Sequence, residues 1–337
     1  MARFVTRSQI QPRAGTLCLA VLALAGGCRR PPADSRVVAV FGSTGLGHGE
    51  FSYPRAIAIS PAGKVFAVDK TGRIQRFDAD GRYETGWRMP AWEKGKPVGL
   101  AVHPDGRLFV ADTHYSRVLI FDQDGGELAR FGREGTGPGE FLLPTSVAFD
   151  SDGFVYVAEY GGNDRISKFT AGLEFVTSFG GPESGEASLL RPTGLTFDAS
   201  GRLWVADACH HRVCCFDRDG RLLTAFGQVG TELGQLRYPY DLAIDDRGRL
   251  LVCEYGNNRL QWFDMDGRSL GTWGTPGRRP GQLAYPWSAD LAPTGRLYVL
   301  DSGNNRVQVL KRGTRPALIH TRDSGLVREG MGETLRR

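Results

Sequence analysis

The sequence lacks any apolar run long enough to cross a bilayer as a helix, which takes about 20 residues. The clearest apolar run, LCLAVLALA at Leu17–Ala25, is much shorter. It follows a basic head, Met1–Gly15, that contains Arg3, Arg7 and Arg13 and no acid. A basic head followed by a short apolar core is typical of an export signal. We therefore predict that the protein is exported.

The body of the chain also lacks an excess of positive charge, although the whole sequence has a formal net charge of +5. Residues 1–36 carry +5 and residues 311–337 carry +4, which leaves −4 for the region between them. A mildly acidic surface repels phosphate backbones. The charge distribution therefore predicts no nucleic-acid partner.

The end of the export signal, Ala25-Gly-Gly-Cys28, resembles the lipobox of bacterial lipoproteins, although Ala25 stands where leucine is usual. This resemblance implies that Cys28 is lipidated and that the protein is anchored to a bacterial membrane in the cell envelope. Ala23-Leu24-Ala25 also fits an ordinary A-x-A cleavage site, which would release a soluble product. We assign residues 1–28 to the signal peptide and residues 29–36 to a tether.

The rest of the chain is an internal repeat. A proline opens each of six units, with spacings of 43 to 48 residues, at Pro54, Pro97, Pro144, Pro192, Pro239 and Pro286. Repeats of this length indicate propellers or solenoids. Short β-branched and aromatic runs alternate with Gly and Asp turns, which predicts four antiparallel strands per unit. In the second unit these are Val98–His103, Leu108–Asp112, Arg117–Asp122 and Glu127–Gly132.

The sixth unit ends without a fourth strand, whereas Val37–Gly42, VVAVFG, precedes the first unit and matches the fourth strands of the others. Pairing this segment with the last unit would close the ring and leave no long unpaired edge. The fold class predicted is all-β: a six-bladed β-propeller of four-stranded antiparallel blades, closed by the N-terminal strand.

The repeats resemble those of the NHL-repeat six-bladed β-propeller family. The supporting motifs are V-A-D…N-x-R-[VI]-x-x-F-D-x-x-G in the blades and FGREGTGPGEFLLP, which begins at Phe131, in a linker. The resemblance covers residues 37–311. We expect residues 312–337 to form a basic mobile tail.

An acid at the end of the second strand and an arginine at the start of the third recur in the units, as in Glu254 and Arg259. Because they recur, we interpret these pairs as structural rather than catalytic. The DxDG sequences, such as Asp122–Gly125, are interpreted as turns rather than calcium loops.

One cluster is not shared between units: ACHHRVCC, Ala208–Cys215. Its side chains suit a soft metal, but Cys214 and Cys215 are neighbours in a strand and point to opposite faces. A disulfide between Cys209 and Cys214 and plain packing are the alternatives. We predict no metal site and no cofactor.

Residues that differ between units near the opening prolines should ring the mouth of the channel, on the face that carries the glycine-rich linkers. Aromatic and arginine side chains at such a place are typical of binding hot spots. The predicted binding residues are Tyr53, Arg55, His114, Tyr160, Arg191, His210, Tyr238, Tyr240, Tyr255, Tyr285 and Trp287.

Two functions fit these observations. The first is a non-enzymatic, monomeric binding scaffold that presents its linker face to a protein, peptide or glycan. The second is an enzyme, because propellers of similar construction include peptidylamidoglycolate lyases, streptogramin lyases and calcium-dependent lactonases. For that alternative, a metal or carboxylate at the channel mouth would come from Asp241, Asp290, Glu159, Glu254, His114 and His210. We favour the first.

Overall fold

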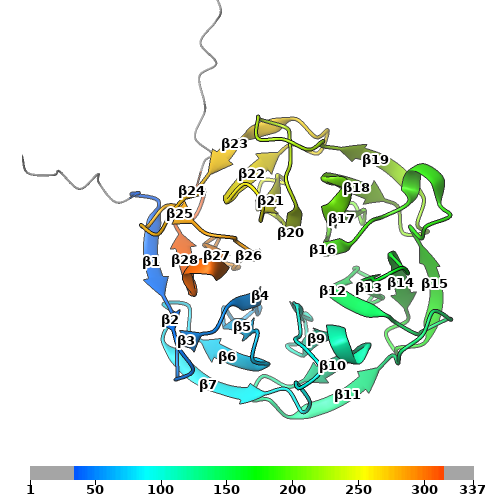
Figure 1. Cartoon of the computed structure of the whole chain (residues 1–337), viewed down its shortest axis with the longest axis horizontal. Coiled ribbons are helices and arrows are strands. Elements are labelled where there is room, and N and C mark those ends of the chain that lie inside the picture. Colours follow the sequence, from blue (N-terminus) through cyan, green and yellow to red (C-terminus); the bar gives the residue numbers. More distant parts are fainter. Residues whose placement is uncertain (1–33, 315–337) are drawn as a thin grey trace, which may run out of the picture. The chain divides into compact units, whose positions relative to one another are not determined.

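The computed structural model describes residues 34–314, which form six four-stranded antiparallel sheets around a central channel (Figure 1). Each sheet is one blade, and the chain enters a blade at its innermost strand and leaves it at its outermost one. The predicted all-β, six-bladed architecture is confirmed. Within this range no helix is both long and apolar enough to cross a membrane.

The first three blades follow each other directly along the chain. From the centre outward, their strands are β4 (Pro54–Ile59), β5 (Val65–Asp69), β6 (Arg73–Phe77) and β7 (Tyr83–Arg88); β8 (Gly99–Val102), β9 (Leu108–Asp112), β10 (Arg117–Phe121) and β11 (Glu127–Phe131); and β12 (Leu143–Phe149), β13 (Val155–Tyr160), β14 (Arg165–Phe169) and β15 (Phe175–Phe179). The strands of the second blade agree with the predicted ones to within one residue at each end.

The last three blades are built in the same way, except that the outer strand of the sixth comes from the other end of the chain. Their strands are β16 (Pro192–Phe197), β17 (Leu203–Asp207), β18 (Arg212–Phe216) and β19 (Leu222–Phe226); β20 (Pro239–Ile244), β21 (Leu250–Glu254), β22 (Arg259–Phe263) and β23 (Ser269–Trp273); and β26 (Ser288–Leu291), β27 (Leu297–Asp301), β28 (Arg306–Leu310) and β1 (Val37–Phe41).

The ring closes where β1 pairs antiparallel with β28, with Phe41 opposite Val307. The predicted closure by the N-terminal strand is therefore confirmed. The segment before β1 is also held, because the indole N–H of Trp273 donates to Asp34 at 2.9 Å. The remaining elements are small: two parallel strand pairs in linkers, β2 (Ser43–Thr44) with β3 (Glu50–Phe51) and β24 (Thr275–Pro276) with β25 (Gln282–Leu283), and the 3-10 helices η1 (Thr113–Tyr115), η2 (Gly185–Ala187), η3 (Ala208–His210) and η4 (Ser302–Asn304).

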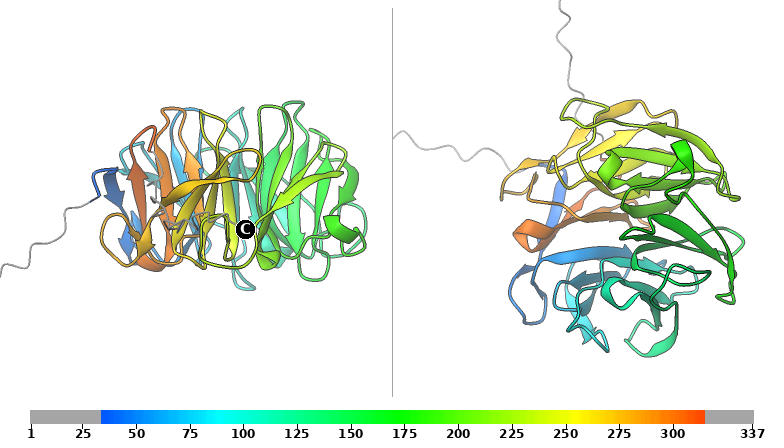
Figure 2. Two further views of the ribbon diagram at one scale, coloured as in Figure 1. Left: turned by 90° about the horizontal axis from the view of Figure 1, so that it is seen from above. Right: turned by 45° about the vertical axis from the view of Figure 1, so that its right-hand side comes forward.

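The apolar core is divided among the contacts between neighbouring blades. Side chains alternate along a strand, so each blade offers one apolar face to the blade before it and another to the blade after it. Phe77 of the first blade packs with Val307 and Val309 of the sixth, which makes the closing contact as apolar as the others. Burial between neighbouring blades, which Figure 2 shows side by side from the edge of the ring, thus stabilises the ring.

In every blade except the second, a buried ion pair ties the linker to the blade that it enters. In the fifth blade the Glu254 carboxylate accepts from Arg259 Nε at a salt-bridge distance of 2.6 Å and from the backbone N–H of Arg237 at 3.2 Å. The Arg259 guanidinium also donates to the carbonyl of Gln235 at 2.9 Å. We call this arrangement the linker clamp. Its geometry agrees with the structural role that the recurrence of the pair predicts.

We predict that Arg259→Met lowers the free energy of unfolding by about 3–5 kcal/mol, because it leaves the fully buried Glu254 without its cation. Burial already raises the pKa of Glu254, and loss of the guanidinium should raise it further. A raised pKa in the folded state means that stability is lost as the pH rises through it. Urea denaturation at pH 5 and pH 8 should therefore show a larger loss of unfolding free energy at pH 8. The double variant Glu254→Gln/Arg259→Met has no buried acid, so a loss as large as that of Arg259→Met alone would contradict this explanation.

Candidate functional site at the channel mouth

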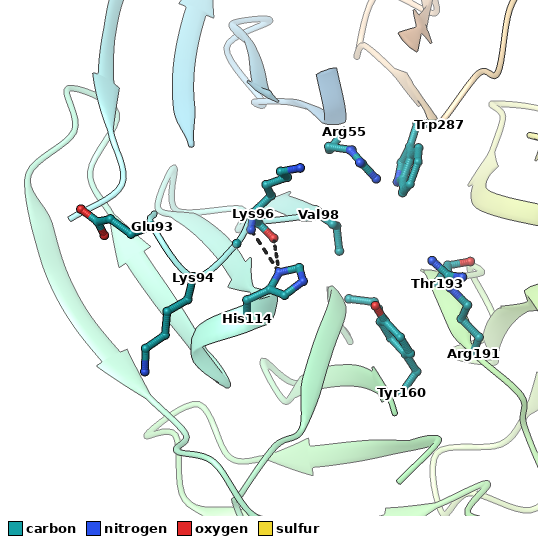
Figure 3. A pocket seen from close by; sticks show the side chains of 12 residues that line it. Arg55, Glu93, Lys94, Lys96, Val98, His114, Tyr160, Arg191, Thr193 and Trp287 are labelled. Carbon is teal, nitrogen blue, oxygen red and sulfur yellow. Dashed lines mark hydrogen bonds between the residues drawn. The ribbon is translucent and has the colours of Figure 1, made fainter. Parts of the chain in front are cut away.

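The linkers and the turns between second and third strands lie on one face of the ring, which we call the linker face. There the channel opens into a cavity of about 500 Å³, the mouth cavity. This volume is within the range of small-molecule sites. Its lining residues come from the first, second, third, fourth and sixth blades: Arg55, Glu93, Lys94, Gly95, Lys96, Val98, His114, Thr145, Tyr160, Arg191, Thr193 and Trp287 (Figure 3).

A strained backbone position places several side chains at this mouth. The residue before the opening proline has a positive φ of 50° to 57° in four blades, at Tyr53, Arg191, Tyr238 and Tyr285. This conformation is unfavourable for bulky residues and persists only where the surroundings impose it. The linker clamp imposes it from one side, since the preceding backbone N–H groups, such as that of Leu190, donate to the clamp acid.

The preceding blade fixes the same residue from the other side. The backbone N–H of Tyr53 donates to Asn305 at 2.6 Å, and that of Tyr285 donates to Asn258 at 2.7 Å. Each acceptor side chain lies in a turn between second and third strands. The pre-proline residue is thus held by two blades at once, which makes the rim of the mouth rigid.

Five aromatic rings from the first, fifth and sixth blades form one cluster at the mouth. Tyr240 stacks on Tyr255 with 4.6 Å between ring centroids, and Trp287 lies 4.8 Å and 5.4 Å from the same two rings. Tyr285 extends the cluster toward solvent, 5.2 Å from Tyr255, with half of its surface exposed. The hydroxyls of Tyr53 and Tyr255 are hydrogen-bonded at 3.2 Å. The cluster is therefore a preformed apolar wall.

Two arginines lie against this wall. The Arg55 guanidinium is 4.0 Å from the ring centroid of Trp287, and that of Arg191 is 5.7 Å from Tyr240 and 5.0 Å from Tyr160. Burial lowers the pKa of Arg55, and the positive charge of Arg191 contributes to this effect. The two cations therefore share one desolvated environment beside the aromatic cluster.

The second blade contributes lining residues that are not among the predicted binding residues. Its linker, MPAWEKGKP, departs from the glycine-rich pattern, and Lys94, Gly95 and Lys96 from it line the mouth cavity. The backbone N–H of Lys96 donates to His114 Nδ1 at 3.1 Å. Figure 3 shows His114 beside the opening and Glu93 at its outer edge. The departure of this linker from the others was the signal available in the sequence.

Below the mouth lies a small pocket of about 30 Å³, which we call the waist, with Thr145, Thr193, Tyr240 and Trp287 in its lining. This is about the volume that one water molecule occupies in the liquid. A second cavity of about 290 Å³, the lower cavity, opens toward the opposite face.

The enzyme hypothesis placed Asp241 and Asp290 at the channel mouth, and for these two residues it is wrong, because they line the lower cavity. Both bond to the next blade: Asp290 accepts the N–H of Ile59 at 2.7 Å, and Asp241 accepts the hydroxyl of Ser288 at 2.5 Å. Burial raises the pKa of Asp241 to about 7 and that of Asp290 to about 6. Their carboxylates fasten the innermost strands to one another.

The other predicted binding and catalytic residues lie partly at the rim of the mouth cavity and partly in linker clamps. His210 bonds to the clamp acid Asp207 at 2.8 Å and does not line the mouth cavity, and Tyr238 packs on His211 at the rim. Glu159 and Glu254 are fully buried in linker clamps. Of the six acids and histidines named for catalysis, His114 alone lines the mouth cavity.

The cysteine cluster contains free thiols, so the alternative of a Cys209–Cys214 disulfide is not adopted. Cys214 packs between the third and fourth blades and Cys215 between the fourth and fifth, on opposite faces of β18 as predicted. Within residues 34–314, no three His, Cys, Asp or Glu side chains are arranged to hold a metal ion. The metal chemistry considered for the enzyme alternative therefore finds no ligand set in this range.

Two family models match parts of this chain. The NHL repeat matches residues 189–216, 236–263 and 283–310, which run from the linker to the third strand of the last three blades. A model described as a 6-bladed beta-propeller matches residues 96–177. The chain is a six-bladed propeller that contains NHL repeats. In the three matched blades the linker clamp and the strained pre-proline residue occur together.

Similar curated proteins include NHL repeat-containing protein 3 of Homo sapiens, 30% identical over 44% of this chain and 44% of that protein. The probable peptidyl-alpha-hydroxyglycine alpha-amidating lyase pgal-1 of Caenorhabditis elegans is 30% identical over 38% of this chain and 40% of its own length. The chain thus spans less than half of the length of these relatives.

Solved structures share the fold across a wider range. A streptogramin B lyase superposes with a TM-score of 0.58 at 15% identity, over 80% of this chain and 95% of that one. Hydrazine synthase of Kuenenia stuttgartiensis gives 0.55 at 16% identity, over 80% and 98%. At this identity the likeness shows the fold alone, and the different names of these proteins illustrate that a propeller does not determine function.

We predict that Asp290→Ala makes stability less dependent on pH. The folded-state pKa of Asp290 is raised to about 6, so its contribution to stability is present in acid and is lost as the pH rises through 6. When the pH rises from 5 to 8, the free energy of unfolding of Asp290→Ala should increase by about 1–2 kcal/mol relative to that of the parent. A fully buried carboxyl would give a larger change, because water in the channel screens the charge of Asp290. Chemical denaturation measures this, and parallel pH profiles would contradict it.

Proposed function

We propose that this protein is a non-enzymatic binding module that captures a protein segment, a peptide or a glycan at the mouth cavity of its linker face. The observation that supports this most is that two arginines and Trp287 line one cavity, and that Trp287 belongs to the five-ring aromatic cluster beside it. Tyrosine, tryptophan and arginine are the residues that dominate binding energy when they lie in a desolvated pocket.

The geometry limits how a ligand can bind. The mouth cavity of about 500 Å³ is continued below only by the small waist pocket, so we expect a side chain or a chain end of the ligand to fill it. The rest of the ligand must lie across the linker face, where Tyr238 and Tyr285 are exposed by 38% and 50%. Because the rim is rigid, little ordering entropy is lost on binding.

The enzyme alternative has support from the names of similar proteins, which include lyases. Its chemistry needs acids, bases or metal ligands gathered at one place. Here the acids are committed to linker clamps or to the lower cavity, and His114 is the only one of the six proposed groups at the mouth. The positions of these groups therefore favour binding over catalysis.

We also propose that the protein works outside the cytoplasm, anchored to a membrane by a lipid on Cys28. This residue and the signal peptide lie outside the described residues, and the proposal depends on the basic head, the apolar core and the lipobox-like end. A lipid anchor would hold a monomeric propeller at the membrane surface.

We expect Cys28→Ser to move the protein from the membrane fraction to the soluble or unprocessed fraction, because the serine hydroxyl cannot replace the thiol in lipid attachment. Fractionation of bacterial cells that express the full chain measures this. Membrane association equal to that of the parent would contradict the anchor and leave cleavage after Ala25 as the alternative.

We expect Trp287→Ala to weaken ligand binding about 30-fold or more, since Trp287 contacts Tyr240, Tyr255 and Arg55 at the centre of the site. Purified residues 29–337 would be screened on peptide and glycan arrays, and the affinity for the strongest ligand measured by calorimetry. Leu223→Ala, which removes an exposed apolar side chain from the outer strand β19, is the matched control. Unchanged affinity in Trp287→Ala would contradict binding at the mouth.

One result would favour the enzyme instead. Stoichiometric zinc or calcium in the purified protein, reduced in His210→Ala or Asp290→Ala, would show that these dispersed groups hold a metal after all. Elemental analysis of the parent and of both variants makes this comparison.

A further inference from the structure

We propose that Arg55 and Arg191 form an oxyanion subsite that holds a carboxylate or phosphate group of the ligand, next to an apolar part that packs on Trp287. This inference deepens the proposed function and rests on it. It commits to the chemistry of the ligand: an anionic group attached directly to an aromatic or apolar body.

The first observation is that each of the two half-buried arginines has a buried Nε without an acceptor. Arg55 Nε and Arg191 Nε are inaccessible to solvent and have no hydrogen-bond partner, and neither side chain pairs with an acid anywhere in residues 34–314. Buried polar groups of native proteins are nearly always satisfied. The arginine of the fifth linker clamp shows the contrast, because Arg259 bonds to Glu254 and to three linker carbonyls.

The second observation is the local charge. The mouth cavity is lined by Arg55, Arg191, Lys94 and Lys96, and its one acid, Glu93, lies at the outer edge (Figure 3). The repeat region as a whole carries −4. A cluster of cations in a cavity with low-dielectric walls attracts anions far more strongly than the same charges on an open surface.

The third observation is the position of the aromatic cluster relative to these cations. Arg55 and Arg191 approach Trp287 and Tyr240, whose ring centroids are only 4.8 Å apart. An oxyanion that receives bonds from either guanidinium therefore places its attached group against an aromatic ring. The small waist pocket lies beside the same two rings, with Tyr240 and Trp287 in its lining.

The test uses purified residues 29–337 and three probes of one shape: phenylacetate, phenyl phosphate and the neutral phenylacetamide. Isothermal titration calorimetry should show that at least one of the two anions binds about tenfold or more tightly than the amide, since bonds to charged groups contribute roughly 1.5–3 kcal/mol each. Preference between phenylacetate and phenyl phosphate distinguishes a carboxylate ligand from a phosphate ligand.

Variants then assign the effect to the two arginines. Arg55→Gln and Arg191→Gln should each weaken the anion about tenfold and leave the amide unchanged. Arg55→Lys should retain part of the affinity, because it keeps the charge and loses the planar fork. Arg221→Gln, at an exposed turn on the opposite face, is the matched control and should bind like the parent.

The same variants carry a second readout. Removal of a half-buried guanidinium whose buried Nε has no acceptor relieves an unfavourable burial, so ligand-free Arg55→Gln should melt at or above the temperature of the parent. Lower melting would show that Arg55 has a structural role and would contradict its assignment to a ligand.

Three results would overturn the subsite. They are equal affinity for anion and amide, anion binding unaffected by both Arg→Gln variants, and the absence of saturable binding by either anion. If the array ligand still depends on Trp287 in any of these cases, the binding module stands and only the anion is excluded. If that ligand does not depend on Trp287, the proposed function itself fails.

Discussion

The linker clamp is the interaction on which the rest of the structure depends. In every blade except the second, the clamp buries a carboxylate, and that carboxylate is stable only because an arginine and a linker N–H compensate its charge. In the fourth blade the clamp acid Asp207 bonds to Arg212 and to the N–H of Leu190. This bond fixes Leu190. Arg191, which follows Leu190 and has the positive φ, is thereby held in place, and so is the position of its side chain. A structural ion pair repeated around the ring thereby shapes the rim of the mouth.

The features that repeat in every blade build the ring, whereas the residues that differ between blades form the candidate site. Six similar interfaces between blades close the ring, and a position that is the same in every blade cannot distinguish one ligand from another. The mouth is asymmetric: aromatic rings come from the first, third, fifth and sixth blades, and cations come from the first, second and fourth. In the second blade, where the linker pattern is lost, Asp112 Oδ1 and Arg117 Nη2 have no partner within residues 34–314. The altered linker no longer reaches its clamp and instead lines the cavity.

Most of the fold could be predicted from the sequence because its signals are local and repeated. The proline spacing, the DxDG turns and the match of Val37–Gly42 to the fourth strands were enough to predict the ring and its closure. The contacts at the site are not local in this sense. Tyr53 and Tyr255 bond across 202 residues, and their proximity depends on the ring closing and on the positive φ at Tyr53, which no residue pattern encodes. The wrong prediction for Asp241 and Asp290 has the same origin. An innermost strand runs along the channel from one opening to the other, and the residue type alone does not say which opening a side chain is near.

The distribution of charge along the channel gives the two cavities different chemistry. Cations line the mouth cavity, whereas the carboxylates of Asp241 and Asp290 border the lower one. Burial raises the pKa of both acids to about 7 and about 6, so near neutral pH the lower cavity carries partial negative charge. An anionic group that entered the mouth would meet attraction from the arginines and repulsion from below the waist. The charges above and below the waist thus act in the same direction, and both favour a negatively charged ligand on the linker face beside Trp287.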